Sequence, residues 1–136
     1  MVGEIFVGQS YRELVVWQKA MELVSGVYKI TTDFPKHEVY GLMSQMRRAA
    51  VSIPSNIAEG QARHSQKEFM HFLAIARGSL AELETQFFVA HDLGYTAGIR
   101  DTEFLELTSH VGCLLNNLCS AIERRTENGQ RRTPLP

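Results

Sequence analysis

The chain has 136 residues, of which 44% are hydrophobic and 21% are charged, and its formal net charge is −1. These values are typical of one ordinary globular domain and argue against the disordered, collagen-like and membrane-embedded classes of protein. A nearly neutral chain lacks the overall positive field that favours phosphate-backbone binding, so any contact with nucleic acid must come from a local group of cations.

The sequence shows neither the pattern of a secretory signal at its start nor an apolar run long enough to span a bilayer. We therefore expect a cytoplasmic protein that makes no membrane contact. Cys113 and Cys119 are separated by six positions on a predicted helix, which places them about 120° apart around its axis. That angle is too wide for a disulfide or a shared metal ion, so we expect both thiols to be reduced and buried.

A first helix is predicted from the capping box Ser10-Tyr-Arg-Glu13 to about Thr31, because serine and glutamate can satisfy free backbone N–H groups at a helix start. Its expected core line is Leu14, Trp17, Met21, Val24 and Tyr28. Three more apolar residues widen this stripe to about 160°, beyond what a helix packed on one side needs. We expect these three to contact neighbouring subunits. They are Val16, Ala20 and Val27.

The second predicted helix runs from about Glu38 to Glu59, and Gly60 is expected to end it. Its expected core line is Leu42, Met46, Ala49, Ile53 and Ile57. Pro54 falls inside this pattern, where it removes one backbone hydrogen bond and clashes with the carbonyl group four residues earlier. We expect a kink between Ala50 and Pro54, with two short helices as the alternative.

A second capping box, Ser65-Gln-Lys-Glu68, predicts the start of a third helix, and Gly94 is its expected end. The expected core line of this helix is Phe69, Leu73, Ala76, Leu80, Leu83 and Phe87. Asp101 is expected to cap a fourth helix that continues to about Arg125. The expected core line of the fourth helix is Phe104, Leu107, Val111, Leu114, Leu118 and Ile122.

Periodic apolar segments, short connections and no alternating strand pattern predict an all-α fold. We expect an antiparallel up-down-up-down four-helix bundle over residues 11–125, with the second helix kinked at Pro54. Residues 1–10 are expected to form a partly disordered leader, and residues 126–136 a disordered tail.

Polar residues of the second helix form a stripe beside its core line, within about 80° of one another. The stripe consists of Gln45, Arg48, Ser52, Asn56 and Glu59. Partly buried polar groups need partners, and the third helix offers Ser79, Glu82 and Gln86. We expect an interhelical pair such as Arg48 with Glu82. Structural or interface contacts are the main interpretation, and a ligand or partner site that includes Glu82 is the alternative.

Catalysis is not expected from this stripe, because it has no histidine, cysteine or activated base. A di-iron bundle would need two E-x-x-H motifs, and the sequence has one, from Glu68 to His71, since Glu106 and His110 are four apart. We therefore predict no metal, no cofactor and no enzymatic activity. The step Gly78-Ser79 inside the third helix is explained by close helix approach.

Arginine is the more abundant of the two cationic residues and suits pairing with phosphate or carboxylate equally. The candidate nucleic-acid contacts are Arg47, Arg63, Arg77, Arg124 and Arg125. A solvated face with local ion pairs is the main interpretation of these arginines, and an RNA or DNA contact is the alternative.

The most specific segment of the sequence is SQMRRAAVSIPSNIAEG, from Ser44 to Gly60. With LVVWQKA at residues 14–20, FP and EVYGL within residues 34–42, and FMHFLAIARGSLAELETQ at residues 69–86, it resembles the four-helix bundle proteins of the 23S rRNA intervening-sequence family. The resemblance covers about residues 11 to 123. On it, the family's polar signature falls on Arg48, Ser52, Asn56, Glu59 and Gly60.

The resemblance implies a bundle that associates into a ring-like homopentamer, in a family first noticed as reading frames inside bacterial ribosomal RNA genes. A related branch serves diversity-generating retroelements as an accessory protein that binds reverse transcriptase and nucleic acid. That branch is strongly basic, whereas this chain is slightly acidic. We predict a non-catalytic, self-assembling scaffold or binding protein. RNA or DNA binding by the assembled oligomer is the alternative, since symmetry can bring sparse arginines together.

Overall fold

The structure is a computed structural model that describes residues 10–132, with side chains described for residues 10–128. Within this part of the chain there are four α-helices and no strands: α1 (Val15–Thr32), α2 (Leu42–Ala62), α3 (Gln66–Asp92) and α4 (Ile99–Arg132). Two short 3-10 helices, η1 (Tyr11–Glu13) and η2 (Lys36–Glu38), precede α1 and α2. The predicted all-α fold with four helices is confirmed.

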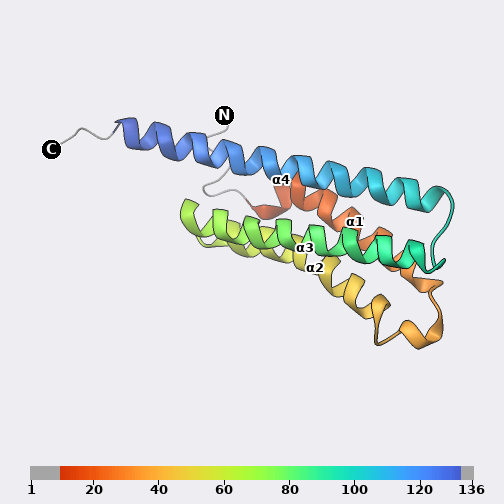
Figure 1. Cartoon of the computed structure of the whole chain (residues 1–136). Coiled ribbons are helices and arrows are strands. Elements are labelled where there is room, and N and C mark those ends of the chain that lie inside the picture. The colour runs from red at the N-terminus through yellow and green to blue at the C-terminus, as the bar shows by residue number, and fades with distance from the viewer. Residues whose placement is uncertain (1–9, 133–136) are drawn as a thin grey trace.

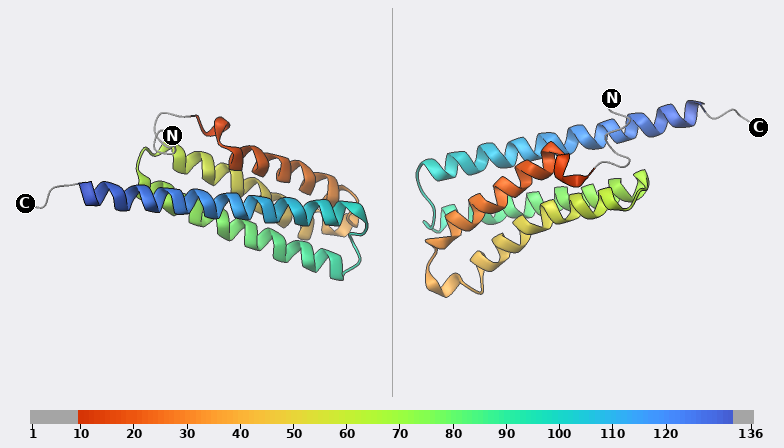
Figure 2. Two further views of the ribbon diagram at one scale, coloured as in Figure 1. Left: turned by 90° about the horizontal axis from the view of Figure 1, so that it is seen from above. Right: turned by 180° about the vertical axis from the view of Figure 1, so that it is seen from behind.

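The helices lie side by side, and the chain doubles back at each connection (Figures 1 and 2). Helix α2 has its most extensive contacts with α3, and α1 contacts both α2 and α4, while α3 contacts α2 and α4. The α1–α2 side and the α3–α4 side are therefore opposite sides of one bundle. Each helix contributes to the core between them, for example through Leu23, Met46, Leu83 and Leu115, which are fully buried. No helix in the described region is both long and apolar enough to cross a membrane.

Helix α1 buries a different face from the one predicted. Ser10 accepts a hydrogen bond from the Arg12 N–H (3.2 Å), but this cap opens η1, and α1 begins only at Val15. Met21 and Tyr28 of the predicted core line are exposed. The three residues predicted to contact other subunits are buried inside the bundle instead, and they are Val16, Ala20 and Val27. That prediction is wrong because the wide apolar stripe has two candidate centres, and only packing against α2 and α4 selects one.

Helix α2 is one continuous helix, so the alternative of two short helices is wrong, whereas the kink at Pro54 stays a prediction. It begins at Leu42 and continues past Gly60 to Ala62. Gly60 does not end the helix; it is buried within it, and a Cβ atom there would lie 2.6 Å from the Phe72 Cβ and 3.1 Å from the Phe69 Cδ1. The glycine is needed because α2 crosses α3 closely at this point.

Helix α3 agrees with its sequence pattern at both ends and along its core line. The Ser65 hydroxyl accepts the Glu68 N–H (3.3 Å), and all six predicted core residues are buried. Gly94 has φ of +79°, and the N–H of Tyr95 reaches the Ala90 carbonyl while the N–H of Gly94 reaches the His91 carbonyl (both 2.9 Å). This pair of bonds is a Schellman motif, in which a left-handed glycine ends the helix as predicted.

Helix α4 is longer than predicted and buries a shifted face. Asp101 lies in its first turn rather than at its cap, and Leu107, Leu114 and Leu118 are only partly buried. The buried positions are Phe104, Thr108, Val111, Leu115, Cys119 and Ile122.

The helix extends past the other three to Arg132, so the predicted disorder from residue 126 is wrong for 126–132 (Figure 1). One reason is that the Thr126 hydroxyl donates to the Gln66 side chain of α3 (2.6 Å). Residues 1–9 and 133–136 lie outside the described residues.

Candidate functional site

The polar stripe of α2 is divided between two roles, and the first is structural. The Ser52 and Ser79 hydroxyl oxygens lie 2.8 Å apart, and the Asn56 Nδ2 donates to the Ser52 carbonyl (2.7 Å) and hydroxyl (2.9 Å). Hydrogen bonds between partly buried polar groups fix the register of adjacent helices. Ser52 therefore joins α2 to α3, and Asn56 supports Ser52 from within α2. Gly78, predicted to allow close approach, has nothing within 4 Å of a Cβ position, so that role falls on Gly60 instead.

The remaining stripe residues point to solvent. The predicted pair of Arg48 with Glu82 is not formed, because Arg48 donates to the Ser44 hydroxyl (3.3 Å) and Glu82 accepts from the Gln86 amide (3.1 Å). Arg48 and Glu82 are both exposed, Arg48 on α2 and Glu82 on α3. Gln45 and Glu59 are also exposed.

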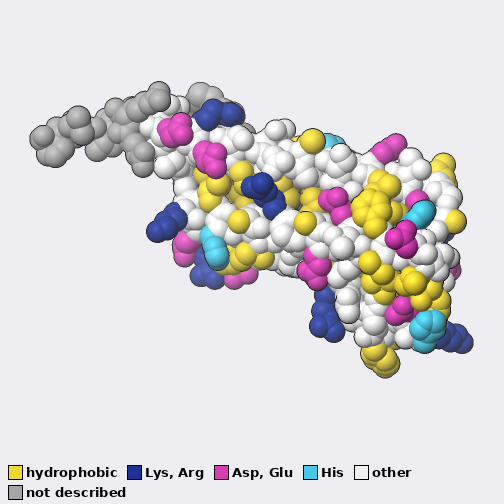
Figure 3. Space-filling view, viewed as in Figure 1, with side chains coloured by type: hydrophobic (Ala, Val, Ile, Leu, Met, Phe, Trp, Pro, Cys, Tyr) yellow, Lys and Arg dark blue, Asp and Glu magenta, His cyan; other side chains and the backbone are white. Residues whose placement is uncertain are grey.

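The candidate nucleic-acid arginines do not form one cluster. Arg47 is a brace between α2 and α1, since its Nε donates to the buried Thr31 hydroxyl (2.9 Å) and its guanidinium lies 4.4 Å from the Tyr28 ring centre. Arg63 pairs with Glu59 (2.9 Å). The other three lie on two helices: Arg77 on α3, and Arg124 and Arg125 on α4. On the face shown in Figure 3, lysines and arginines are interspersed with acidic side chains.

The cysteines differ in their surroundings, which corrects the expectation that both are buried. Cys113 is exposed and Cys119 is buried, and both are free thiols. Burial raises the pKa of the Cys119 thiol, against the opposing effect of the nearby Arg77 guanidinium. In the described part of the chain, no three side chains of the His, Cys, Asp and Glu types are grouped to hold a metal ion.

A clasp joins the α1–α2 connection to the α3–α4 connection. The Tyr95 hydroxyl lies 3.4 Å from the His37 Nε2, and its ring centre lies 5.4 Å from that of Phe34. Hydrogen bonding to the nearby Glu38 carboxylate raises the pKa of Tyr95, and burial and the charge of that carboxylate raise it further. Sequence reasoning missed the clasp because its members come from loops that the helical pattern does not connect.

Two exposed apolar patches are the main surface features that the sequence analysis missed. The first, called the α1–α2 patch, consists of the exposed Tyr28, Val39, Tyr40 and Val51 together with the partly buried Met43. All but Tyr40 line a surface hollow of about 590 Å³, together with Arg47, Arg48 and two serines. Tyr40 is 97% exposed, which is unusual for so large an aromatic side chain.

The second is a set of five exposed apolar residues around the end of α3 and the start of α4, called the α3–α4 patch: Phe88, Val89, Leu93, Ile99 and Leu105. Ile99 is 75% exposed, and the others are exposed by about a third or more. Phe87 stacks on Phe104 in the core with ring centres 4.3 Å apart, whereas the adjacent Phe88 and Leu105 are exposed. The signal in the sequence was the run of apolar residues from Phe87 to Ala90, which exceeds what one helix face buries.

These observations can be compared with known proteins. A comparison with curated proteins finds no match. A family model described as 23S rRNA-intervening sequence protein matches residues 12–117, from η1 to the middle of α4. The match contains the Ser52–Ser79 contact, the close crossing at Gly60 and both apolar patches. The chain therefore belongs to the 23S rRNA-intervening sequence protein family.

Proposed function

We propose that this protein is a non-catalytic scaffold that assembles with copies of itself. The observation that supports the proposal is the presence of two sets of exposed apolar side chains, the α1–α2 patch and the α3–α4 patch. Each contains an exposed aromatic residue, Tyr40 in one and Phe88 in the other, and aromatic residues are enriched in the buried centres of protein interfaces. In the proposed contact, the α1–α2 patch of one copy packs on the α3–α4 patch of the next.

A contact between two different patches is heterologous, so each added copy leaves one patch free at each end. Such a chain either closes into a ring or grows into a filament, and the family resemblance favours a ring of five copies. The proposal takes the helices as an antiparallel up-down-up-down bundle with α2 bent at Pro54. A bend there would set the direction of the half of α2 that carries Met43 and Val51.

The test is the mass of the purified protein in solution, measured by light scattering after gel filtration. One variant combines Val39→Asp with Tyr40→Asp, and the other combines Phe88→Asp with Leu93→Asp. Each should be monomeric because a desolvated carboxylate opposes apolar contact. Ile75→Asp is the matched control, since Ile75 is exposed but lies outside both patches, and it should assemble like the wild type. Circular dichroism checks that every variant is folded.

Mixing the two double variants provides the decisive measurement. Each retains one intact patch, and the two intact patches are complementary, so the mixture should form a dimer with one copy of each variant. A monomeric wild-type protein would refute the proposal of self-assembly. A mixture that stays monomeric would show that the contact does not join one patch to the other.

RNA or DNA binding by the assembled oligomer is the alternative. It is supported by the exposure of Arg77 and Arg124, which form no ion pair among the described residues. Binding should weaken steeply with salt, and Arg77→Met with Arg124→Met should reduce that salt dependence. Arg63→Met is the control because Arg63 is already paired with Glu59. No binding at low salt would exclude this function.

A further inference from the structure

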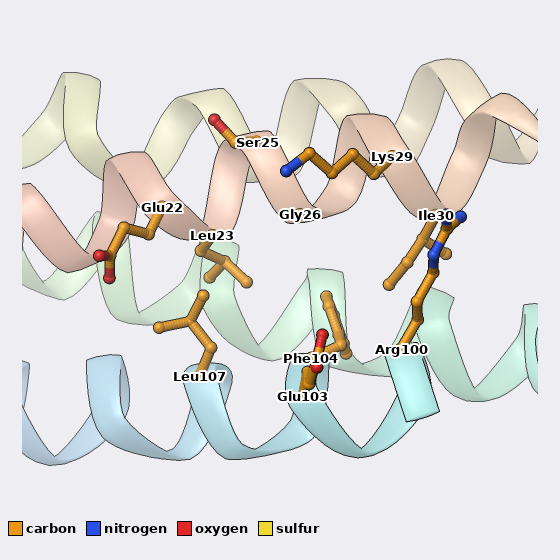
Figure 4. A pocket seen from close by; sticks show the side chains of 10 residues that line it. All are labelled: Glu22, Leu23, Ser25, Gly26, Lys29, Ile30, Arg100, Glu103, Phe104 and Leu107. Carbon is orange, nitrogen blue, oxygen red and sulfur yellow. The ribbon is translucent and has the colours of Figure 1, made fainter. Parts of the chain in front are cut away.

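A hollow of about 430 Å³ lies between α1 and α4, outside both apolar patches (Figure 4). Its volume falls in the range of pockets that hold small molecules, roughly 300 to 1,000 Å³. The floor is apolar and consists of side chains that also belong to the core, namely Leu23, Ile30 and Phe104. A ligand that covers this floor needs an apolar body.

Gly26 lines the hollow from α1 and explains why space remains there. A Cβ atom at Gly26 would meet nothing within 4 Å, in contrast to Gly60, where α2 and α3 cross closely. A glycine inside a helix costs about 1 kcal/mol relative to alanine, and here no close helix approach within the described chain accounts for it. The missing side chain instead leaves room beside the apolar floor.

Charged side chains stand around this floor with little internal pairing. Glu22 is paired with Lys19 (3.0 Å), and Arg100 reaches Asp33 only at 3.5 Å, between two exposed side chains, so that contact contributes little. Lys29 and Glu103 form no ion pair with another described residue. Lys29 comes from α1, whereas Arg100 and Glu103 come from α4 (Figure 4).

We propose that the hollow binds a small zwitterion with an apolar side chain, of the α-amino acid class. Lys29 and Arg100 would bind its carboxylate, and Glu103 would bind its ammonium group. The apolar side chain would lie on Ile30 and Phe104. A plain carboxylic acid would leave Glu103 unpaired beside it, and a plain amine would leave two cations unpaired, so both should bind more weakly.

The first experiment is calorimetric titration of the full chain with L-leucine and L-phenylalanine. The comparison ligands are 4-methylpentanoate, which is leucine without its amino group, and 3-methylbutylamine, which is leucine without its carboxylate. At least one amino acid should bind in the millimolar range or tighter, and each comparison ligand at least about tenfold more weakly, as for the loss of one charged hydrogen bond. If neither amino acid binds, or if removing either charged group has no effect, the proposal is wrong.

The second experiment uses variants at Gly26. Gly26→Leu should fold, because the position faces open space, and its side chain should fill the hollow and abolish binding. Gly26→Ala is the matched control, since it adds helix propensity while leaving most of the space. Glu103→Gln should weaken amino acid binding at least tenfold without weakening 4-methylpentanoate. Unchanged amino acid affinity in Gly26→Leu would place the ligand elsewhere and overturn the proposal.

Discussion

Replacing Gly60 by alanine tests the close crossing of α2 and α3. The added Cβ would lie 2.6 Å from the Phe72 Cβ, 3.1 Å from the Phe69 Cδ1 and 3.4 Å from the Phe69 carbonyl oxygen. Carbon atoms in contact prefer separations of about 3.5 to 4.0 Å, so the helices must move apart by roughly 1 Å. Such overpacking costs about 1 to 3 kcal/mol, and the gain in helix propensity returns about 1 kcal/mol. We expect Gly60→Ala to lower the free energy of unfolding by up to about 2 kcal/mol.

Gly26→Ala is the matched substitution at a helical glycine without neighbours. Nothing lies within 4 Å of its Cβ position, so only helix propensity changes, and the variant should be stabilised by about 0.5 to 1 kcal/mol. The two variants therefore have opposite expected signs for the same chemical change. Thermal unfolding followed by circular dichroism measures both, with a shift of roughly 4 °C per kcal/mol for a chain of this size.

Self-association would make the unfolding temperature depend on protein concentration, so all samples are compared at one concentration. The elution volume of each variant on gel filtration shows whether its assembly is unchanged. If Gly60→Ala unfolds at a higher temperature than the wild type, as Gly26→Ala should, then α2 and α3 do not cross as closely as described and the reasoning fails.

Three further predictions concern single side chains. Because the pKa of Tyr95 is raised in the folded chain, its contribution to stability is present below pH 10.0, the ordinary tyrosine pKa. That contribution is lost as the pH rises through the raised pKa, so the unfolding temperature should fall at alkaline pH. Tyr95→Phe should make this fall less steep. An unchanged decline would exclude Tyr95 as its source. Cys113 should react with a thiol reagent at once and Cys119 only after denaturation, and two equally fast thiols would contradict the burial of Cys119. Arg47→Met should lower the free energy of unfolding by about 1 to 3 kcal/mol in urea titration, because a buried hydroxyl loses its donor, and no loss would show that the brace is not formed.

The sequence by itself determined the number of helices and nearly all of α3. That helix carries its own boundary signals, the Ser65 cap and the Gly94 stop, and its predicted core line from Phe69 to Phe87 is buried. Local chemistry was sufficient there because each signal acts within one or two helical turns. The polar stripe of α2 was also found from spacing, and its Ser52 does join α2 to α3, while Asn56 donates to Ser52 within α2.

Only the tertiary structure decided which face of α1 is buried and what each glycine does. In the sequence, three apolar residues of α1 lie beside its predicted core line: Val16, Ala20 and Val27. They belong to the core because α2 and α4 pack on that side of α1. Gly60 and Gly26 are both glycines in a helical pattern, but one meets phenylalanine side chains and the other open space. Periodicity reports the angle between side chains around one helix, and it contains no information about where the neighbouring helices lie.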